Sequence, residues 1–180
     1  MNVPNAICYF RVLLAFFGFW HFYQTGDKNF FFVLTVIVIS LDALDGIAAR
    51  KLNQATEFGA KLDIYADRVV ELAYWLFFAL MNLVHIWVFI FFLLRGTVVD
   101  YLSRKNPKPL GDSFLRSSRV MRGGYGFFKL LSFCALILMP FYRLPFFEFE
   151  TLTNIIVYIT VLLCFLRAVP VLQDQFTSSK

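Results

Sequence analysis

The chain has 180 residues, of which 59% are hydrophobic and only 16% are charged, and its formal net charge is +5. A typical soluble domain is about 45–50% apolar and about 25% charged, so this composition argues against a soluble globular protein. It also excludes an intrinsically disordered chain, and three separated cysteines exclude a disulfide scaffold. We therefore expect an all-α integral membrane protein with a single domain over residues 1–180.

Six predominantly apolar segments approach the roughly 20 residues that a helix needs to cross a bilayer. The amino terminus lacks the basic region and the small-residue cleavage site of a signal peptide, so no signal peptide is predicted. In chain order, the predicted membrane helices cover residues 4–24, 30–50, 57–81, 86–102, 120–139 and 152–171.

The first three predicted helices differ in where they carry charge. The first has Arg11 as its only charged residue, and the second is uncharged until Asp42 and Asp45 near its end. The third begins with Asp63 and Asp67 and then becomes apolar. Because charged groups are costly inside a bilayer, these acidic residues require a functional or structural reason.

Basic residues are concentrated between the second and third helices and around the fourth and fifth. The excess of Lys and Arg in cytoplasmic links predicts that both termini and both basic links face the cytoplasm. Part of this charge has a simpler explanation, which is contact with anionic lipid headgroups. We expect the protein to lie in the inner membrane of a bacterium. We also expect a polar cavity between its helices, on the cytoplasmic side. The basic residues of the two links are Arg50, Lys51, Lys61, Arg68, Arg95, Arg104, Lys105, Lys108, Arg116, Arg119 and Arg122.

The four aspartates form two pairs with helical spacing. Asp42 and Asp45 are three residues apart, and Asp63 and Asp67 are four apart, so each pair occupies one face of its helix. Gly59 lies on the same stripe as the second pair. If the two helices are antiparallel neighbours, all four carboxylates converge near the cytoplasmic edge of the bilayer.

Converging carboxylates repel one another unless protons or cations compensate their charge. Oxygen ligands favour hard cations, and four carboxylates suffice for two Mg²⁺ or Mn²⁺ ions, a clamp suited to diphosphate chemistry. Close helix packing is the usual explanation of a membrane glycine. Gly46 and Gly59 lie on or beside the carboxylate faces, which favours close approach of a nucleotide instead. The guanidinium of Arg50 suits diphosphate oxygens, or else it pairs with Glu57.

The signature of these residues resembles that of the CDP-alcohol phosphatidyltransferase family, which includes phosphatidylglycerophosphate and phosphatidylinositol synthases. The resemblance implies that the four aspartates bind two divalent cations and that Asp67 takes the proton of the acceptor hydroxyl. It implies cytidine-facing roles for Gly46 and Gly59, a small packing position at Ala49, a diphosphate contact at Arg50, and a homodimer. The substrates would be CDP-diacylglycerol and a small alcohol, with no nucleic acid as partner. The pattern reads Asp42-x2-Asp45-Gly46-x2-Ala49-Arg50-x8-Gly59-x3-Asp63-x3-Asp67.

A second basic set lies beyond the fourth helix, and it contains more cations than one diphosphate requires. This surplus favours an acceptor that itself carries phosphate, and we expect glycerol 3-phosphate, with inositol or an inositol phosphate as the alternative. Directly after Asp67, phosphatidylglycerophosphate synthases usually have a lysine, whereas this chain has Arg68. In this position the chain is more similar to phosphatidylinositol synthases. Nearby, Gly123, Gly124 and Gly126 are expected to allow close helix contact. The expected acceptor-binding residues are Arg95, Arg119, Arg122 and Lys129.

Two other classes fit part of the pattern. A divalent-cation transporter also places carboxylates between membrane helices, but its polar groups should line a path across the whole bilayer. A purely structural use of Asp–Arg pairs would not need four acids at one depth. Both alternatives explain the clustering at one end less well than an enzyme does.

Overall fold

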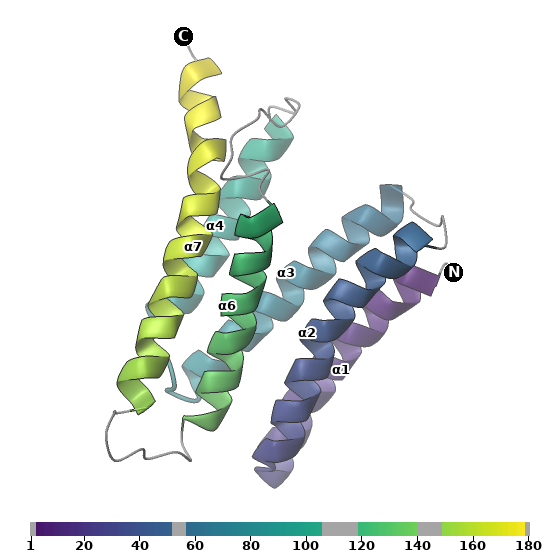
Figure 1. Cartoon of the computed structure of the whole chain (residues 1–180), viewed down its shortest axis with the longest axis vertical. Coiled ribbons are helices and arrows are strands. Elements are labelled where there is room, and N and C mark those ends of the chain that lie inside the picture. The colour runs from purple at the N-terminus through teal and green to yellow at the C-terminus, as the bar shows by residue number, and fades with distance from the viewer. Residues whose placement is uncertain (1–2, 52–56, 106–118, 140–148, 179–180) are drawn as a thin grey trace. The chain divides into compact units, whose positions relative to one another are not determined.

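The computed structural model describes residues 3–51, 57–105, 119–139 and 149–178. Over these ranges the chain is helical and contains no strand, which confirms the all-α prediction with its six helices. The side chains of residues 42–51 and 119–122 lie outside the described set. The helices are α1 (Val3–Thr25), α2 (Lys28–Lys51), α3 (Glu57–Leu80), α4 (Ile86–Lys105), α6 (Arg119–Leu138) and α7 (Phe149–Ser178) (Figure 1).

The chain divides into two compact units, which are described separately below. The amino-terminal unit, Met1–Phe78, contains α1, α2 and nearly all of α3. The carboxy-terminal unit, Ala79–Lys180, contains α4, α6 and α7.

In the amino-terminal unit, α1 and α2 are antiparallel neighbours joined by a tight turn (Figure 1). Gly26 adopts a φ of 65°, a conformation that glycine reaches without a steric penalty, and its N–H donates to the carbonyl of Phe22 at 2.8 Å. The carboxylate of Asp27 accepts the N–H of Phe30 at 3.1 Å, which satisfies one donor in the first turn of α2. The turn residues between the first two predicted helices therefore act as helix-ending signals.

Aromatic rings link the three helices of the amino-terminal unit. The ring of Phe19 lies 4.8 Å from the rings of both Tyr74 and Phe77, measured between centroids, and Phe31 stacks on Tyr74 at 6.2 Å. The buried Tyr74 hydroxyl donates to the Thr35 hydroxyl at 3.1 Å, which joins α3 to α2. A buried hydroxyl with a partner avoids the desolvation penalty of an unmade hydrogen bond.

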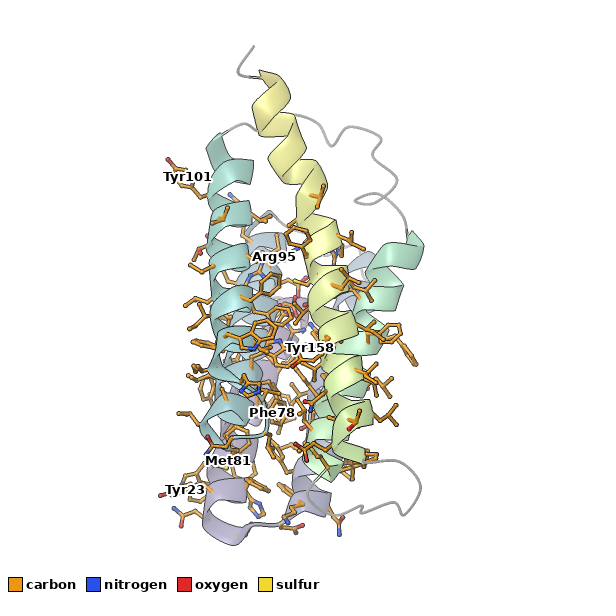
Figure 2. The ribbon with its side chains drawn as sticks, turned by 90° about the vertical axis from the view of Figure 1, so that its left-hand side faces the viewer. Tyr23, Phe78, Met81, Arg95, Tyr101 and Tyr158 are labelled. Atoms are coloured by element: carbon orange, nitrogen blue, oxygen red, sulfur yellow. The ribbon has the colours of Figure 1, made fainter. Side chains whose placement is uncertain are left out.

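Polar and aromatic contacts join the described helices of the carboxy-terminal unit. The hydroxyls of Ser132 and Thr160 lie 2.7 Å apart, and Thr160 also donates to the carbonyl of Phe128 at 3.1 Å, so α6 is bonded to α7. On α4, Trp87 stacks on Tyr158 of α7 with centroids 5.9 Å apart (Figure 2). The close contact expected at Gly123, Gly124 and Gly126 is not observed, since a Cβ at each would meet no described heavy atom within 4 Å.

Two helical segments are long and apolar enough to cross a membrane, namely Asn5–Thr25 and Phe149–Val169. Three shorter described stretches are also apolar: Lys28–Leu41, Ile86–Val99 and Gly123–Leu138. Large exposed apolar side chains line these helices, among them Leu13, Trp20 and Leu162. These features support a membrane protein, whereas six crossings remain a prediction.

Candidate functional site

The four signature aspartates lie on two helices of the amino-terminal unit. Asp63 and Asp67 stand near the start of α3, and Asp42 and Asp45 stand near the end of α2. Figure 1 shows that the end of α2 and the starts of α1 and α3 lie at the same end of this unit. The side chains of the α2 pair lie outside the described residues, so convergence of all four carboxylates stays a prediction.

Asp63 contacts two side chains of α1. Its Oδ1 lies 3.7 Å from Nη2 of Arg11 and 4.0 Å from Sγ of Cys8, which donates to it. Arg11 is only 1% exposed, whereas the Asp63 side chain is 46% exposed. The sequence marks Arg11 as the lone charge of an apolar helix, but a partner so far along the chain is not visible without the fold.

The α3 carboxylates have the donor chemistry for a hard divalent cation. Asp63 and Asp67 are both partly exposed and one helical turn apart. Carboxylate oxygens are the ligands that Mg²⁺ and Mn²⁺ prefer. Two carboxylates do not complete a site, and the described side chains include no group of three or more potential metal ligands. The residues present therefore fit such a cation, and the contribution of Asp42 and Asp45 to the site stays a prediction.

The predicted nucleotide-binding residues are placed by backbone position alone. Gly46, Ala49 and Arg50 lie in the last turns of α2, and their surroundings are outside the described side chains. Gly59 lies in the first turn of α3, one turn before Asp63. Their roles in binding CDP-diacylglycerol remain predictions.

One acidic residue was missed by the sequence reasoning. Glu71 continues the four-residue steps of Asp63 and Asp67 along α3, is 4% exposed, and pairs with Arg68 at 3.7 Å. Its spacing from Asp67 could have been read from the sequence. Because an unpaired buried carboxylate is strongly disfavoured, Arg68 gives Glu71 the counter-ion that its burial requires.

The expected acceptor-binding residues lie in the carboxy-terminal unit. Arg95 on α4 is partly buried, with an Nε that has no hydrogen-bond partner among the described residues, and it lies on the side of α4 that faces α7 (Figure 2). On α6, Lys129 is 8% exposed with its Nζ 5.8 Å from the Tyr125 ring centroid. Arg119 and Arg122 begin α6, and their side chains lie outside the described set.

Arg167 of α7 is a cation that the sequence reasoning overlooked. Its guanidinium carbon lies 5.0 Å from the centroid of the Tyr125 ring, which Lys129 also approaches. Cation–π contacts of this kind hold a guanidinium in place without neutralising it. The α6–α7 pair therefore brings two positive side chains to one aromatic ring.

Comparison with known proteins gives a consistent picture. A sequence model of the CDP-alcohol phosphatidyltransferase family matches residues 1–166. The chain is 44% identical over 80 residues to a CDP-diacylglycerol–inositol 3-phosphatidyltransferase of Drosophila melanogaster, covering 40% of this chain and 34% of that protein. It is 36% identical over 98 residues to a CDP-diacylglycerol–glycerol-3-phosphate 3-phosphatidyltransferase of Aquifex aeolicus, covering 53% of each. The chain thus spans about a third to a half of the length of these relatives.

Proposed function

Because the chain belongs to the CDP-alcohol phosphatidyltransferase family, we propose that it transfers the phosphatidyl group of CDP-diacylglycerol to a small alcohol and releases CMP. The observation that carries this proposal is the complete aspartate signature, Asp42 to Asp67, within the matched region. The resemblance seen in the sequence and the family match agree. The reaction transfers a substituted phosphate group in phospholipid synthesis.

The proposed chemistry divides between the aspartates and the substrates. Asp42, Asp45, Asp63 and Asp67 would hold two divalent cations, Mg²⁺ or Mn²⁺, which would supply positive charge to neutralise the diphosphate and favour departure of CMP. Asp67 accepts the proton of the acceptor hydroxyl while its oxygen attacks the phosphorus of the phosphatidyl group. A new P–O bond forms to the acceptor, the P–O bond to CMP breaks, and CMP leaves with the bonding electron pair.

The remaining signature residues bind the nucleotide in this proposal. Gly46 and Gly59 allow the cytidine to approach the helix backbone. Ala49 has a small side chain, which allows close packing at that position. Arg50 contacts diphosphate oxygens through its planar guanidinium, which matches them better than a lysine does.

We propose glycerol 3-phosphate as the acceptor. Arg95, Lys129, Arg119 and Arg122 supply the cations that a phosphorylated acceptor requires, and Arg167 is added to this set because it shares the Tyr125 ring with Lys129. The Aquifex aeolicus relative is named for glycerol 3-phosphate as acceptor, and the Drosophila melanogaster relative is named for inositol. Inositol or an inositol phosphate is therefore the alternative acceptor.

The same proposal includes a cellular setting. The six helices cross the membrane, both termini and the aspartates face the cytoplasm of a bacterial cell, and two copies form a homodimer as the family resemblance implies. The basic residues beside the predicted cytoplasmic links support this orientation.

An acceptor panel tests the function directly. Purified protein with Mn²⁺ and CDP-diacylglycerol receives glycerol 3-phosphate, inositol, inositol phosphate or serine, and the product lipid and CMP are measured. We expect product with glycerol 3-phosphate and none after chelation of the metal. Product with inositol alone would replace the acceptor, and absence of CMP release with every acceptor would contradict the activity.

A further inference from the structure

Arg11 is the only charged residue of α1, and it is almost completely buried. Placing a guanidinium in an apolar helix is costly unless an opposite charge accompanies it. The opposite charge is Asp63, whose Oδ1 lies 3.7 Å from Nη2 of Arg11. The buried cation of α1 is therefore directed at a signature aspartate of α3.

We propose that Arg11 is a positioning residue for the Asp63 carboxylate, and that it sets the affinity of the site for its divalent cations. The inference rests on the proposed function, because Asp63 is assigned there as a metal ligand. Arg11, which is 1% exposed, contacts Oδ1, while the Asp63 side chain remains 46% exposed. The carboxylate is thus anchored at one oxygen and accessible to a ligand.

The contact has features of a dedicated anchor. Cys8 precedes Arg11 by three residues, so both lie on one face of α1, and its thiol donates to the same Oδ1 at 4.0 Å. Two side chains of α1, Cys8 and Arg11, therefore contact the same carboxylate oxygen of Asp63.

Removal of Arg11 has two opposing effects on cation affinity. Loss of a positive charge near the carboxylates strengthens their attraction for a cation. Because the Asp63 side chain is 46% exposed, the high dielectric constant of the nearby solvent reduces this effect. Loss of the anchor frees the carboxylate to rotate. Removing a residue that contacts a metal ligand but not the metal commonly lowers the affinity for the metal about 10–100-fold. Since the first effect is screened, we expect the second to dominate.

Mn²⁺-dependent thermal stabilisation tests the inference without relying on turnover. The full chain in detergent is titrated with Mn²⁺, and the concentration that gives half of the maximal increase in Tm is compared between variants. For Arg11→Gln we expect this midpoint to rise about tenfold. For Arg11→Lys, which keeps the charge but loses the planar fork, we expect a smaller rise. An unchanged or lower midpoint in Arg11→Gln would overturn the inference.

Tyr74→Phe is the matched control. It removes a buried hydrogen bond between α2 and α3 of the same unit, so it lowers stability without touching Asp63. Its Mn²⁺ midpoint should equal that of the unmodified chain, whereas a purely structural role of Arg11 predicts that Arg11→Gln behaves in the same way as this control. If Arg11→Gln does not fold, Arg11→Lys decides, and an unchanged midpoint there overturns the inference.

A second control separates this inference from the proposed function. In an Asp63→Asn background, Arg11→Gln should cause no further rise in the midpoint, because the carboxylate that it positions is gone. If the unmodified chain shows neither Mn²⁺ stabilisation nor CMP release, the proposed function fails and the inference fails with it. If the unmodified chain responds and Arg11→Gln responds identically, only the inference fails.

Discussion

At the scale of single residues, Asp67 has the most specific chemical role in the proposed reaction. Asparagine has nearly the same shape but lacks the negative charge that accepts a proton and binds a cation. We expect Asp67→Asn to lower kcat for CMP release at least about 100-fold, since general base catalysis alone contributes about 10²–10⁴-fold. CMP release from CDP-diacylglycerol, measured with saturating acceptor and Mn²⁺, checks this expectation.

Glu150→Gln provides the comparison for that variant. Glu150 is an exposed carboxylate in the first turn of α7, so its neutralisation changes net charge equally without altering the signature. Its activity should match that of the unmodified chain. Full activity in Asp67→Asn would remove the proton-accepting role from this residue.

Single residues also show how far sequence reasoning reaches. The spacing of Asp63 and Asp67 places them one turn apart because helical periodicity is local, and the structure has them on α3. The contact of Asp63 with Arg11 depends on how α1 packs against α3, and no local pattern encodes it. Arg167 was missed for the same reason, because only the packing of α6 and α7 brings it to Tyr125.

At the scale of helices, the approach of α1 to α2 depends on Gly18. A Cβ built there would lie 2.6 Å from Cδ2 of Leu34 and 3.5 Å from Phe31. Leu34 is only 7% exposed, so its side chain has little room to move away. We expect Gly18→Ala to lower the free energy of unfolding by about 1–3 kcal/mol, the usual cost of overpacking. Reversible unfolding in detergent measures the change.

Gly126→Ala is the counterpart on α6. A Cβ at this position meets no described heavy atom within 4 Å, so no clash arises. Alanine also favours a helix over glycine by about 1 kcal/mol in water, so stability should stay the same or rise. Equal destabilisation of both variants would contradict the assignment of the cost at Gly18 to packing against Leu34.

The helices themselves were predictable to a large extent. Hydrophobic runs and the turn residues around Gly26 mark their ends, since both are local features of the sequence. Close approach between helices was not predictable in the same way. A close contact was expected at the glycines of α6, but no described heavy atom lies within 4 Å of a Cβ built there. Gly18, by contrast, lies at a close contact that no local signal distinguishes.

At the scale of the whole molecule, the expected orientation follows from charge. An even number of crossings places both termini on one side, and the excess of Lys and Arg assigns that side to the cytoplasm. The link between α1 and α2 and the link between α3 and α4 then face outward. The link between α2 and α3, beside the signature aspartates, faces inward.

Cysteine labelling of intact cells tests this orientation. Asn29 and His85 are exposed residues at the two links expected outside, and Asn53 is in the link expected inside. We expect Asn29→Cys and His85→Cys to react with a membrane-impermeant maleimide, and Asn53→Cys to react only after permeabilisation. The native Cys8 and Cys164 are buried and Cys134 is partly buried, so the unmodified chain should give a low background. Reaction of Asn53→Cys in intact cells would place the link between α2 and α3, and with it the aspartates, on the outer face of the membrane. This result would contradict the expected cytoplasmic orientation of the site.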